Sequence, residues 1–280
     1  MRIRFLFAAV LASGCINVSA PPRPAPAPTP APAPAPAAEP EPNRADHRLL
    51  YATLWLQTAA EYRAAALQTF TTAGRAVEDA LADPVWTAAV EQETAPAGLP
   101  PAVIVDIDET VLDNSPYEAR LIRDRETFSG ETWNAWVEER AALAVPGAVE
   151  FAREAAARGV TVFYVSNRDA SAELATRENL RAAGFPLDRR TDVVLLRGER
   201  GWTESDKSAR RAAVASTHRI LLLVGDDLGD FLPNVRVSRA ERDALVSRYE
   251  EKWGTSWFVV PNPMYGSWER AILEGAEDPD

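Results

Sequence analysis

The chain has 280 residues, enough for one large domain or two small ones, and its hydrophobic fraction of 46% suffices for a sizeable core. Its net charge of −11 argues against general binding of nucleic acid polymers, because such binding needs a basic surface. The single cysteine, Cys15, excludes an intramolecular disulfide, and the two histidines, His47 and His218, lack the spacing of zinc ligands.

The first fifteen residues have the pattern of a bacterial export signal. Residues 1–4 (MRIR) give a charged start, and residues 5–11 form an apolar core that is too short for a comfortable transmembrane helix. The string LASGC at residues 11–15 then resembles a lipobox whose cysteine, Cys15, would be acylated; ordinary cleavage beside an incidental cysteine is the alternative. Ile16 follows in place of an aspartate, so the resemblance implies an exported lipoprotein of the outer membrane, facing the periplasm or the cell surface.

We therefore predict a signal peptide at 1–14, a lipidated cysteine with a linker at 15–43, and a folded domain at 44–280. The segment from Pro21 to Pro42 is almost wholly proline and alanine, a composition that cannot bury a core and favours extended polyproline II. At about 3.1 Å per residue, such a segment spans roughly 70 Å. It is interpreted as a stalk, with disordered filler as the alternative.

The folded domain is predicted to begin with a helix from Ala45 to Ala82, where apolar residues recur near a period of 3.6 until Asp83-Pro84 ends the pattern. Further along, strands alternate with helices, which indicates βαβ units and a mainly parallel sheet. The predicted strands lie at 103–105, 160–165, 192–196, 220–224 and 256–260, and the predicted helices at about 115–124, 131–140, 147–158, 171–183 and 239–252.

Two local patterns predict helix starts near polar residues. The string SPYE that begins at Ser115 matches a capping box with proline at the first helical position, so Ser115 is interpreted as a helix cap. The string from Thr203 to Asp206 has a cap-like pattern as well. It predicts a helix that carries Lys207 in its first turns.

Two carboxylates follow the strand at 103–105. Asp106 and Asp108 lie at its carboxyl end, where ligands bind in open α/β sheets. Neighbouring carboxylates repel each other, and a hard cation with a preference for oxygen, such as Mg²⁺, is the usual neutralising partner. Asp106 could also attack an electrophile, because carboxylates form aspartyl-phosphate intermediates. The structural alternative is that both acids merely end the strand and cap the next element.

Two more predicted strands end in polar groups. The string SNRD from Ser166 to Asp169 ends one strand, and the segment from Asp226 to Asp230 follows another. Because parallel strands place their carboxyl ends on one rim, we expect these groups to converge there with Lys207. Each has a plain structural explanation by itself. The joint order Asp-x-Asp, Ser, Lys, Asp-x-x-x-Asp favours a single functional site.

The string DIDETVLDNS, from Asp106 to Ser115, resembles motif one of the haloacid dehalogenase superfamily. More narrowly, it is similar to the class C acid phosphatases, bacterial outer-membrane lipoproteins with four signature aspartates, and the string from Leu54 to Arg63 is similar to their amino-terminal helical part. The resemblance implies a Rossmannoid three-layer α/β sandwich with a mainly parallel sheet and a smaller helical cap. The core would comprise about 100–112 and 146–262, and the cap elements about 44–99 and 113–145.

The resemblance also implies roles for the four aspartates. Asp106 would attack phosphorus and bind Mg²⁺ through its other oxygen. Asp108 would protonate the leaving oxygen and later activate water, while its backbone carbonyl ligates the metal. Asp226 would be the third protein ligand, and Asp230 would complete the metal site by orienting its shell. Asp227 departs from the commoner asparagine or neutral residue; it would face solvent or, as the alternative, tighten metal binding.

Substrate contacts follow from the same resemblance. Ser166 and Lys207 would hold the phosphoryl oxygens, and Asn167 and Arg168 match the second motif, although Arg168 receives no definite contact. The aromatic residues Trp133 and Tyr265 fall where the class C enzymes place a pair that flanks a nucleobase; their alternative is packing within the cap.

We therefore predict Mg²⁺-dependent hydrolysis of phosphate monoesters through an aspartyl-phosphate intermediate, with a moderately acidic optimum. The substrates would be nucleoside 5′-monophosphates and other small esters, the membrane would be reached through the lipid anchor, and a homodimer stays open. The alternatives are a phosphotransferase of the same superfamily and a non-catalytic lipoprotein that binds a ligand or heme. A response-regulator receiver also has strand-end acids and a lysine, but it lacks the second aspartate at this spacing and would not be exported behind a lipobox.

Overall fold

A parallel sheet of five strands forms the centre of the fold, as the computed structural model shows for residues 44–92, 96 and 98–273. All of these residues belong to one compact unit, Pro42–Asp280. The predicted signal peptide, Cys15 and the proline-rich linker lie outside the described residues. Among the residues that are described, no helix combines the length and the apolar character needed to span a membrane.

The strand order in the sheet is β5-β4-β1-β6-β7, and every pair is parallel. The central strand, β1 (Pro101–Val105), lies between β4 (Thr161–Asp169) and β6 (Arg219–Gly225). The edges are β5 (Val194–Arg197) and β7 (Trp257–Val259). The strands were predicted from continuous apolar runs, and such runs are typical of strands that are buried on both faces of a parallel sheet.

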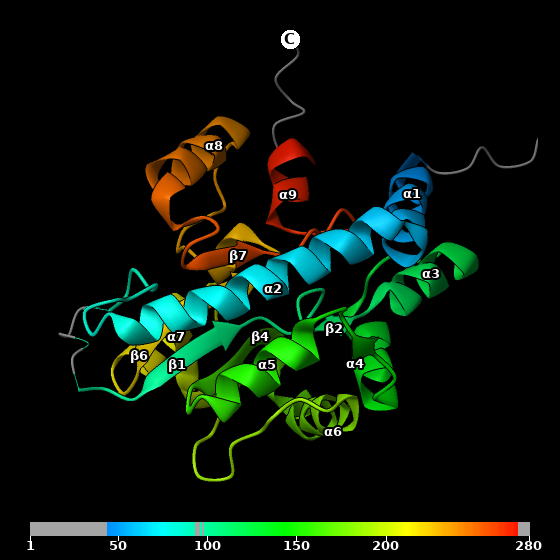
Figure 1. Ribbon diagram of the computed structural model, residues 1–280. Coiled ribbons are helices and arrows are strands. Elements are labelled where there is room, and N and C mark those ends of the chain that lie inside the picture. Colours follow the sequence, from blue (N-terminus) through cyan, green and yellow to red (C-terminus); the bar gives the residue numbers. More distant parts are fainter. Residues whose placement is uncertain (1–43, 93–95, 97, 274–280) are drawn as a thin grey trace, which may run out of the picture. The chain divides into compact units, whose positions relative to one another are not determined.

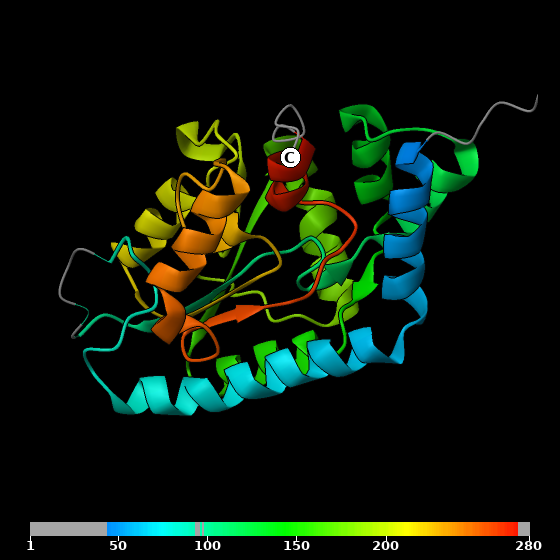
Figure 2. The same cartoon turned by 90° about the horizontal axis from the view of Figure 1, so that it is seen from above.

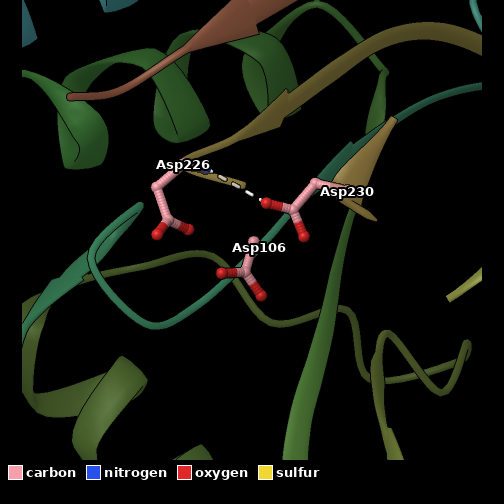
Figure 3. Close-up of side chains that lie close together, drawn as sticks. All are labelled: Asp106, Asp226 and Asp230. Carbon is pink, nitrogen blue, oxygen red and sulfur yellow. Dashed lines mark hydrogen bonds between the residues drawn. The ribbon is translucent and has the colours of Figure 1, made fainter. Parts of the chain in front are cut away.

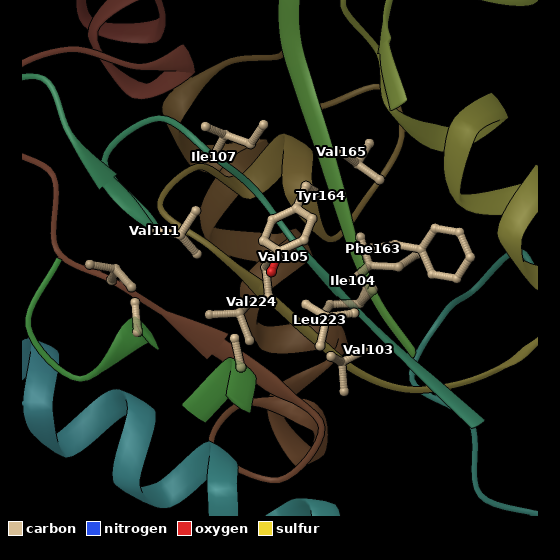
Figure 4. Close-up of a cluster of buried hydrophobic side chains, with 14 of the residues drawn as sticks. Val103, Ile104, Val105, Ile107, Val111, Phe163, Tyr164, Val165, Leu223 and Val224 are labelled. Carbon is tan, nitrogen blue, oxygen red and sulfur yellow. The ribbon is translucent and has the colours of Figure 1, made fainter. Parts of the chain in front are cut away.

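The core lies along β1 and its two neighbours, as Figure 4 shows. Val103 pairs in register with Val162 on β4 and with Leu222 on β6, so three apolar strands present side chains to both faces. Full burial of one such side chain contributes about 1.5–3 kcal/mol. Tyr164 joins this core and donates its hydroxyl to the carbonyl of Pro186 at 3.0 Å, which satisfies the one polar atom of a buried ring.

Helices cover both faces of the sheet (Figures 1 and 2). On one face, α2 (Ala60–Ala82) packs against α5 (Ala148–Ala157) and contacts β6 and β7. On the other, α6 (Glu173–Ala183) contacts β5 and α7 (Ser208–Ala215) contacts β6. The predicted three-layer α/β sandwich with a mainly parallel sheet is therefore confirmed. By its contacts, α2 belongs to a sheet-covering layer, although residues 44–99 were assigned to the cap.

A smaller group of elements lies beyond the carboxyl end of β1 (Figure 1). It comprises α1 (Arg44–Thr58), which packs against α3 (Ser115–Asp124), and α4 (Gly130–Glu139), which contacts α6. Two short strands, β2 (Leu112–Asp113) and β3 (Leu143–Ala144), pair antiparallel at its base. These elements stand where the sequence predicts a cap over the pocket.

The carboxyl-terminal part adds two helices, α8 (Arg239–Arg248) and α9 (Ser267–Leu273). The predicted helix at 239–252 ends earlier, at Arg248, and continues as a 3₁₀ turn. The patterns did not predict α9, β2 or β3, because their periodic segments are too short to register. Short 3₁₀ turns lie at Ala170–Ala172, Glu199–Gly201, Leu228–Asp230 and Glu250–Lys252.

Three local predictions are wrong. The helix expected from Ala45 to Ala82 is broken at Ala59, which has an extended backbone with ψ 126°. The break follows Thr58, whose hydroxyl donates back to the carbonyl of Leu54 at 2.6 Å, a local bond that competes with helix continuation. Trp55 and Tyr62 meet edge-to-face across it at 5.7 Å, and this tertiary contact outweighs the uninterrupted helical pattern.

The capping box at Ser115 does not form. The cap position belongs to Asn114, Ser115 is the first helical residue, and the Ser115 hydroxyl is buried without a hydrogen-bond partner among the described residues. The backbone N–H of Ser115 instead donates to Oδ1 of Asp113 at 2.8 Å. The helix predicted from Thr203 likewise starts later, at Ser208, whose backbone N–H donates to Asp206, so Lys207 occupies the cap position.

Candidate active site

The strand ends converge as predicted. Asp106 follows β1, the segment from Ser166 to Asp169 closes β4, and Asp226 follows β6, and these three strands are neighbours in the sheet. Their side chains meet a pocket of about 1320 Å³ at that rim. Its lining includes most of the predicted site residues, namely Asp106, Asp108, Trp133, Asn167, Arg168, Lys207, Asp226, Asp230 and Tyr265. The remaining one, Ser166, is fully buried beside them.

Three carboxylates form one cluster. Oxygens of Asp106, Asp226 and Asp230 all lie within 4.8 Å of one another, and Figure 3 shows the three side chains converging from two loops. Asp226 is held by Thr110, which donates its hydroxyl at 3.1 Å, and by Asn262, which donates its amide at 2.8 Å. These two contacts aim one carboxylate at the others.

Asp230 is fixed by its own backbone turn. Its Oδ2 accepts hydrogen bonds from the backbone N–H groups of Asp226 at 3.1 Å and Asp227 at 2.9 Å. A Cβ on Gly225 would lie 2.3 Å from Cβ and Oδ2 of Asp230, so this close approach requires glycine. Lys207 donates to the other oxygen of Asp230 at 2.6 Å and also to Asp106.

The charges of this cluster do not cancel. With all three carboxylates ionised, they and the Lys207 ammonium would sum to −2. Burial raises the pKa of Asp106 to about 7, with Lys207 opposing and Asp230 and Asp108 reinforcing the shift. Burial, then the charges of Asp230 and Asp106, hold the pKa of Asp226 well above its usual range. Burial disfavours the charged form of Lys207, but the two carboxylates outweigh it and raise its pKa. A hard divalent cation with oxygen ligands fits this charge and donor set.

Asp108 has different partners from Asp106. Arg168 donates to its Oδ1 from Nη2 at 2.8 Å and from Nε at 3.0 Å, and Ser166 donates its hydroxyl to Oδ2 at 3.0 Å. Asn114 adds its side-chain amide at 3.0 Å. The carboxylate of Asp108 thus lies outside the three-acid cluster and in a fixed orientation. Arg168, to which the sequence assigned no definite contact, is a buried ion-pair partner of Asp108.

The two predicted aromatic residues line the same pocket as the carboxylates. The Trp133 ring meets Tyr117 edge-on at 5.2 Å, and the guanidinium of Arg168 lies 5.8 Å from the Trp133 ring centroid. Tyr265 donates its hydroxyl to Glu109. Both rings therefore lie in the pocket wall and also pack against neighbours.

Glu109 is a site residue that the sequence analysis missed. It is buried with φ 58°, a left-handed conformation that is uncommon for a residue with a side chain. It accepts the backbone N–H of Asn114 at 2.7 Å, and burial, followed by the charges of Asp108 and Asp226, holds its pKa well above the usual range. No local signal pointed to this role, because its partner Tyr265 is 156 residues away.

Asp227 is partly exposed in the wall of the pocket and lies outside the three-acid cluster. Its carboxylate accepts from the backbone N–H of Gly229 at 2.8 Å and from the backbone and hydroxyl of Ser267 at 2.6 and 2.7 Å. It therefore connects the end of β6 to the start of α9. Two further residues that the analysis missed, Arg210 and Arg211, are fully buried on α7. Their spacing of three and four residues from Lys207 was a signal that could have placed them on its face.

Comparison with known proteins identifies the family. The family model described as "HAD superfamily, subfamily IIIB (Acid phosphatase)" matches residues 50–268. The class C acid phosphatase from Bacillus anthracis is similar in structure, with a TM-score of 0.71 and 32% identity over 84% of this chain and 92% of that one. Its structure with tungstate bound gives the same TM-score and identity over 82% and 90%.

Two plant proteins are related over a shorter stretch. "Acid phosphatase 1" from Solanum lycopersicum is 31% identical over 166 residues, which cover 58% of this chain and 57% of that protein. The "Stem 31 kDa glycoprotein" from Glycine max is 27% identical over 166 residues, 58% of each chain. The match thus spans less than two thirds of either relative. With the family model matching most of its length and the strand-end acids meeting at one pocket, the chain belongs to subfamily IIIB of the HAD superfamily, the acid phosphatases.

Proposed function

We propose that the protein hydrolyses phosphate monoesters, with Asp106 as the nucleophile and Asp108 as the proton donor and acceptor. The observation that carries this proposal is the buried cluster of Asp106, Asp226 and Asp230 around Lys207, in a pocket at the carboxyl end of the sheet. Family membership supports the reaction class. The tungstate bound by the B. anthracis enzyme, an oxyanion with the tetrahedral shape of phosphate, supports an oxyanion site here.

Asp106 and Asp226 would hold a divalent cation, which we propose is Mg²⁺, with Asp230 orienting them. When bound, the cation would offset the repulsion among the carboxylates and stabilise charge on the phosphoryl oxygens. Lys207 would donate to a phosphoryl oxygen from the position where it now bridges Asp106 and Asp230. Polar groups beside Ser166, such as the Asn167 amide, would supply further donors along the rim, because the Ser166 hydroxyl itself donates to Asp108.

In the first half-reaction, a carboxylate oxygen of Asp106 bonds to phosphorus while the bond from phosphorus to the ester oxygen breaks, and Asp108 gives its proton to the departing oxygen. The product is an aspartyl phosphate on Asp106 and a free alcohol. In the second, Asp108 takes a proton from water, whose oxygen attacks phosphorus and releases inorganic phosphate and the Asp106 carboxylate. Arg168, Ser166 and Asn114 hold the Asp108 side chain for both transfers.

Nucleoside 5′-monophosphates are the proposed substrates among small esters. Trp133 and Tyr265 line the pocket that holds the acids, and two aromatic faces can stack on a base without reading its edges. In such a site the base contributes to binding and the phosphoryl group to the reaction. Trp133→Ala should therefore raise KM for a nucleotide more than for an aryl phosphate, and an equal increase for both would contradict the stacking role.

The test of the reaction is hydrolysis of a panel of phosphate esters with Mg²⁺ or with a chelator. We expect activity with Mg²⁺, loss of activity with the chelator, and recovery when Mg²⁺ is restored. Asp106→Asn should be inactive while it keeps a wild-type circular dichroism spectrum. Release of phosphate by this variant at the wild-type rate would contradict a nucleophilic Asp106. Transfer of phosphate to an added alcohol would identify a phosphotransferase.

We also propose that the domain is exported and anchored to the outer membrane through Cys15. The support is the pattern of residues 1–15 and the proline-rich segment that follows it. Labelled fatty acid should be incorporated into the wild type and not into Cys15→Ser. Equal labelling of both would remove the basis for the anchor.

A further inference from the structure

The first turn of α7 brings three cations to the underside of the pocket. Lys207 lies at its cap position, and Arg210 and Arg211 follow three and four residues later, which places all three on one face. Lys207 bonds to Asp106 and Asp230. Arg211 donates to the backbone carbonyls of Gly229 at 2.8 Å and Asp230 at 3.0 Å, so it supports the loop of the acid cluster.

Arg210 contacts the other side of the site. Its side chain is 0% exposed, its Nη1 donates to the carbonyl of Ser166 at 2.5 Å, and its Nη2 donates to Oδ1 of Asn167 at 2.6 Å. Longer contacts run from Nη2 to the carbonyls of Glu204 and Asp206 at 3.4 and 3.3 Å. Its hydrogen-bond acceptors are thus backbone carbonyls and one amide, and none of them is a carboxylate.

Burial lowers the pKa of Arg210 only to about 10, so its side chain stays charged at acidic and neutral pH. A guanidinium with this degree of burial and no acidic acceptor is costly. Its two short hydrogen bonds go to Ser166 and Asn167, and its Nε has no hydrogen-bond partner among the described residues. If Arg210 had only a structural role, backbone carbonyls anywhere around it could accept its hydrogen bonds. Two of the acceptors that Arg210 uses belong instead to the segment at which the proposed phosphoryl site is built.

The contact with Asn167 fixes the direction of its amide. A guanidinium has five N–H donors and no acceptor, so the atom that faces Arg210 must be the oxygen of the amide and the NH₂ group must point elsewhere. Asn167 is exposed and lines the pocket, and no described residue accepts a hydrogen bond from its Nδ2. The NH₂ group is thereby left as a donor for a ligand in the pocket.

We propose that Arg210 is a positioning residue for the phosphoryl site: it locks the Asn167 amide with its NH₂ group toward the bound oxyanion and holds the Ser166–Asn167 peptide in place. Holding this peptide in place also positions Asp108, because the Ser166 hydroxyl donates to the Asp108 carboxylate. The same hydroxyl accepts the backbone N–H of Arg168 at 3.0 Å. This inference rests on the proposed phosphatase function, and it concerns binding of the oxyanion more than the chemical step.

Arg211 supplies a matched control. It is equally buried and lies one residue further on the same helix, but it pairs with Glu91 at 2.6 Å and supports the loop of the acid cluster. Arg211→Met therefore removes an equivalent buried charge without touching Asn167. Its effect should fall on the affinity for Mg²⁺ and should be independent of any substitution at Asn167.

The experiment measures tungstate binding by calorimetry, with KM and kcat for an aryl phosphate, in the Mg²⁺-loaded protein. Asn167→Ala should weaken tungstate binding about tenfold, the loss of one hydrogen bond to a charged ligand, and raise KM more than it lowers kcat. Arg210→Met should weaken it by a similar factor. The double variant should be no weaker than either single one, because both changes remove the same donor. Arg211→Met should instead leave the effect of Asn167→Ala on tungstate binding unchanged, because its own effect falls on the affinity for Mg²⁺.

Asn167→Asp keeps the shape and the contact with Arg210 but presents a carboxylate oxygen in place of NH₂. It should weaken tungstate binding beyond Asn167→Ala, so the part of the proposal that concerns the Asn167 donor is tested even if Arg210→Met fails to fold. Unchanged tungstate binding in Asn167→Ala, equal binding by the Asp and Ala variants, or multiplied effects of Arg210→Met and Asn167→Ala would each overturn the proposal. A wild type that neither hydrolyses esters nor binds tungstate would overturn the phosphatase function itself, so the two failures are distinct.

Discussion

Asp106 and Asp108 are two residues apart in the sequence, yet their surroundings in the fold differ. Asp106 shares Lys207 with Asp230 and lies in the three-acid cluster. Asp108 is held by the fork of Arg168 and by Ser166. In paired catalytic carboxylates, the environment of each one sets which acts as nucleophile and which as acid. In this structure Asp108 accepts hydrogen bonds from Arg168 and Ser166, which favour its charged form, so it must gain a proton before it can act as the proposed acid.

Glu118 is the residue whose titration gives a testable pH dependence. It is 5% exposed, and burial, reinforced by the charge of Glu269, raises its pKa from 4.5 to about 7. Between these values the folded chain keeps the proton that the unfolded chain has lost, so stability falls as pH rises through this window. Glu118→Gln removes the effect, and its free energy of unfolding at pH 8 should exceed the wild-type value by up to about 3 kcal/mol.

The measurement is urea unfolding of both proteins from pH 4 to pH 8, with the difference between them taken at each pH. The variants should be similar at pH 4, where Glu118 is protonated in both states. Glu138→Gln, a change at an exposed carboxylate on α4, should give no such trend. A constant difference across the whole range would contradict a raised pKa at Glu118.

At the scale of elements, the segment between β7 and α9 is bound to the rim at two points. Asp227, after β6, holds the start of α9 through Ser267, and Glu109, after β1, accepts the hydroxyl of Tyr265. Both anchors come from loops that carry aspartates of the proposed active site. The position of Tyr265 in the pocket wall is therefore set by these contacts with the rim, and not by the backbone preference of the segment between β7 and α9 alone.

Asp227→Ala should release this segment and raise KM for a nucleoside 5′-monophosphate about tenfold, since several hydrogen bonds to one carboxylate are lost. The KM for a small alkyl phosphate, which does not reach the aromatic wall, should change little. Tyr265→Phe, which keeps the ring and loses the bond to Glu109, should have an intermediate effect. Steady-state kinetics on both substrates checks this. Ser238→Ala, which removes the cap of α8, should leave both KM values unchanged, and equal increases for the two substrates would contradict the coupling.

At the scale of the whole domain, the acid cluster links metal binding to folding. Three clustered carboxylates, two of them buried, repel one another more than the single Lys207 offsets in the folded state, whereas the unfolded chain exposes them to water. A cation that binds only the folded state adds about 2.7 kcal/mol of stability at one hundred times its Kd. The melting temperature should therefore rise with Mg²⁺ and fall with a chelator.

Asp226→Asn is the informative variant for this prediction, because it removes one ligand charge and relieves part of the repulsion. Its melting temperature in chelator should equal or exceed that of the wild type, and the increase on adding Mg²⁺ should be much smaller. Differential scanning calorimetry measures both. A wild-type melting temperature that is the same with Mg²⁺ and with chelator would contradict a metal at this cluster.

The sequence by itself determined the sheet and the rim. Continuous apolar runs such as 220–224 identify strands buried on both faces, and acids directly after them must lie at the carboxyl ends, because parallel strands run in one direction. The predicted positions of Asp106, Ser166 and Asp226 follow from this geometry and from the family resemblance. Local periodicity and strand direction are encoded within short segments, so they can be read without the fold.

Only the tertiary structure decided which side chains meet. The contact of Asp227 with Ser267, the bond from Tyr265 to Glu109 and the fork of Arg168 on Asp108 join residues whose separation in sequence carries no signal. The same holds for Arg210, because its proposed role depends on its contact with the Asn167 amide, 43 residues away. Hydrogen bonds and ion pairs act over a few ångströms in space, and packing of the whole chain sets those distances.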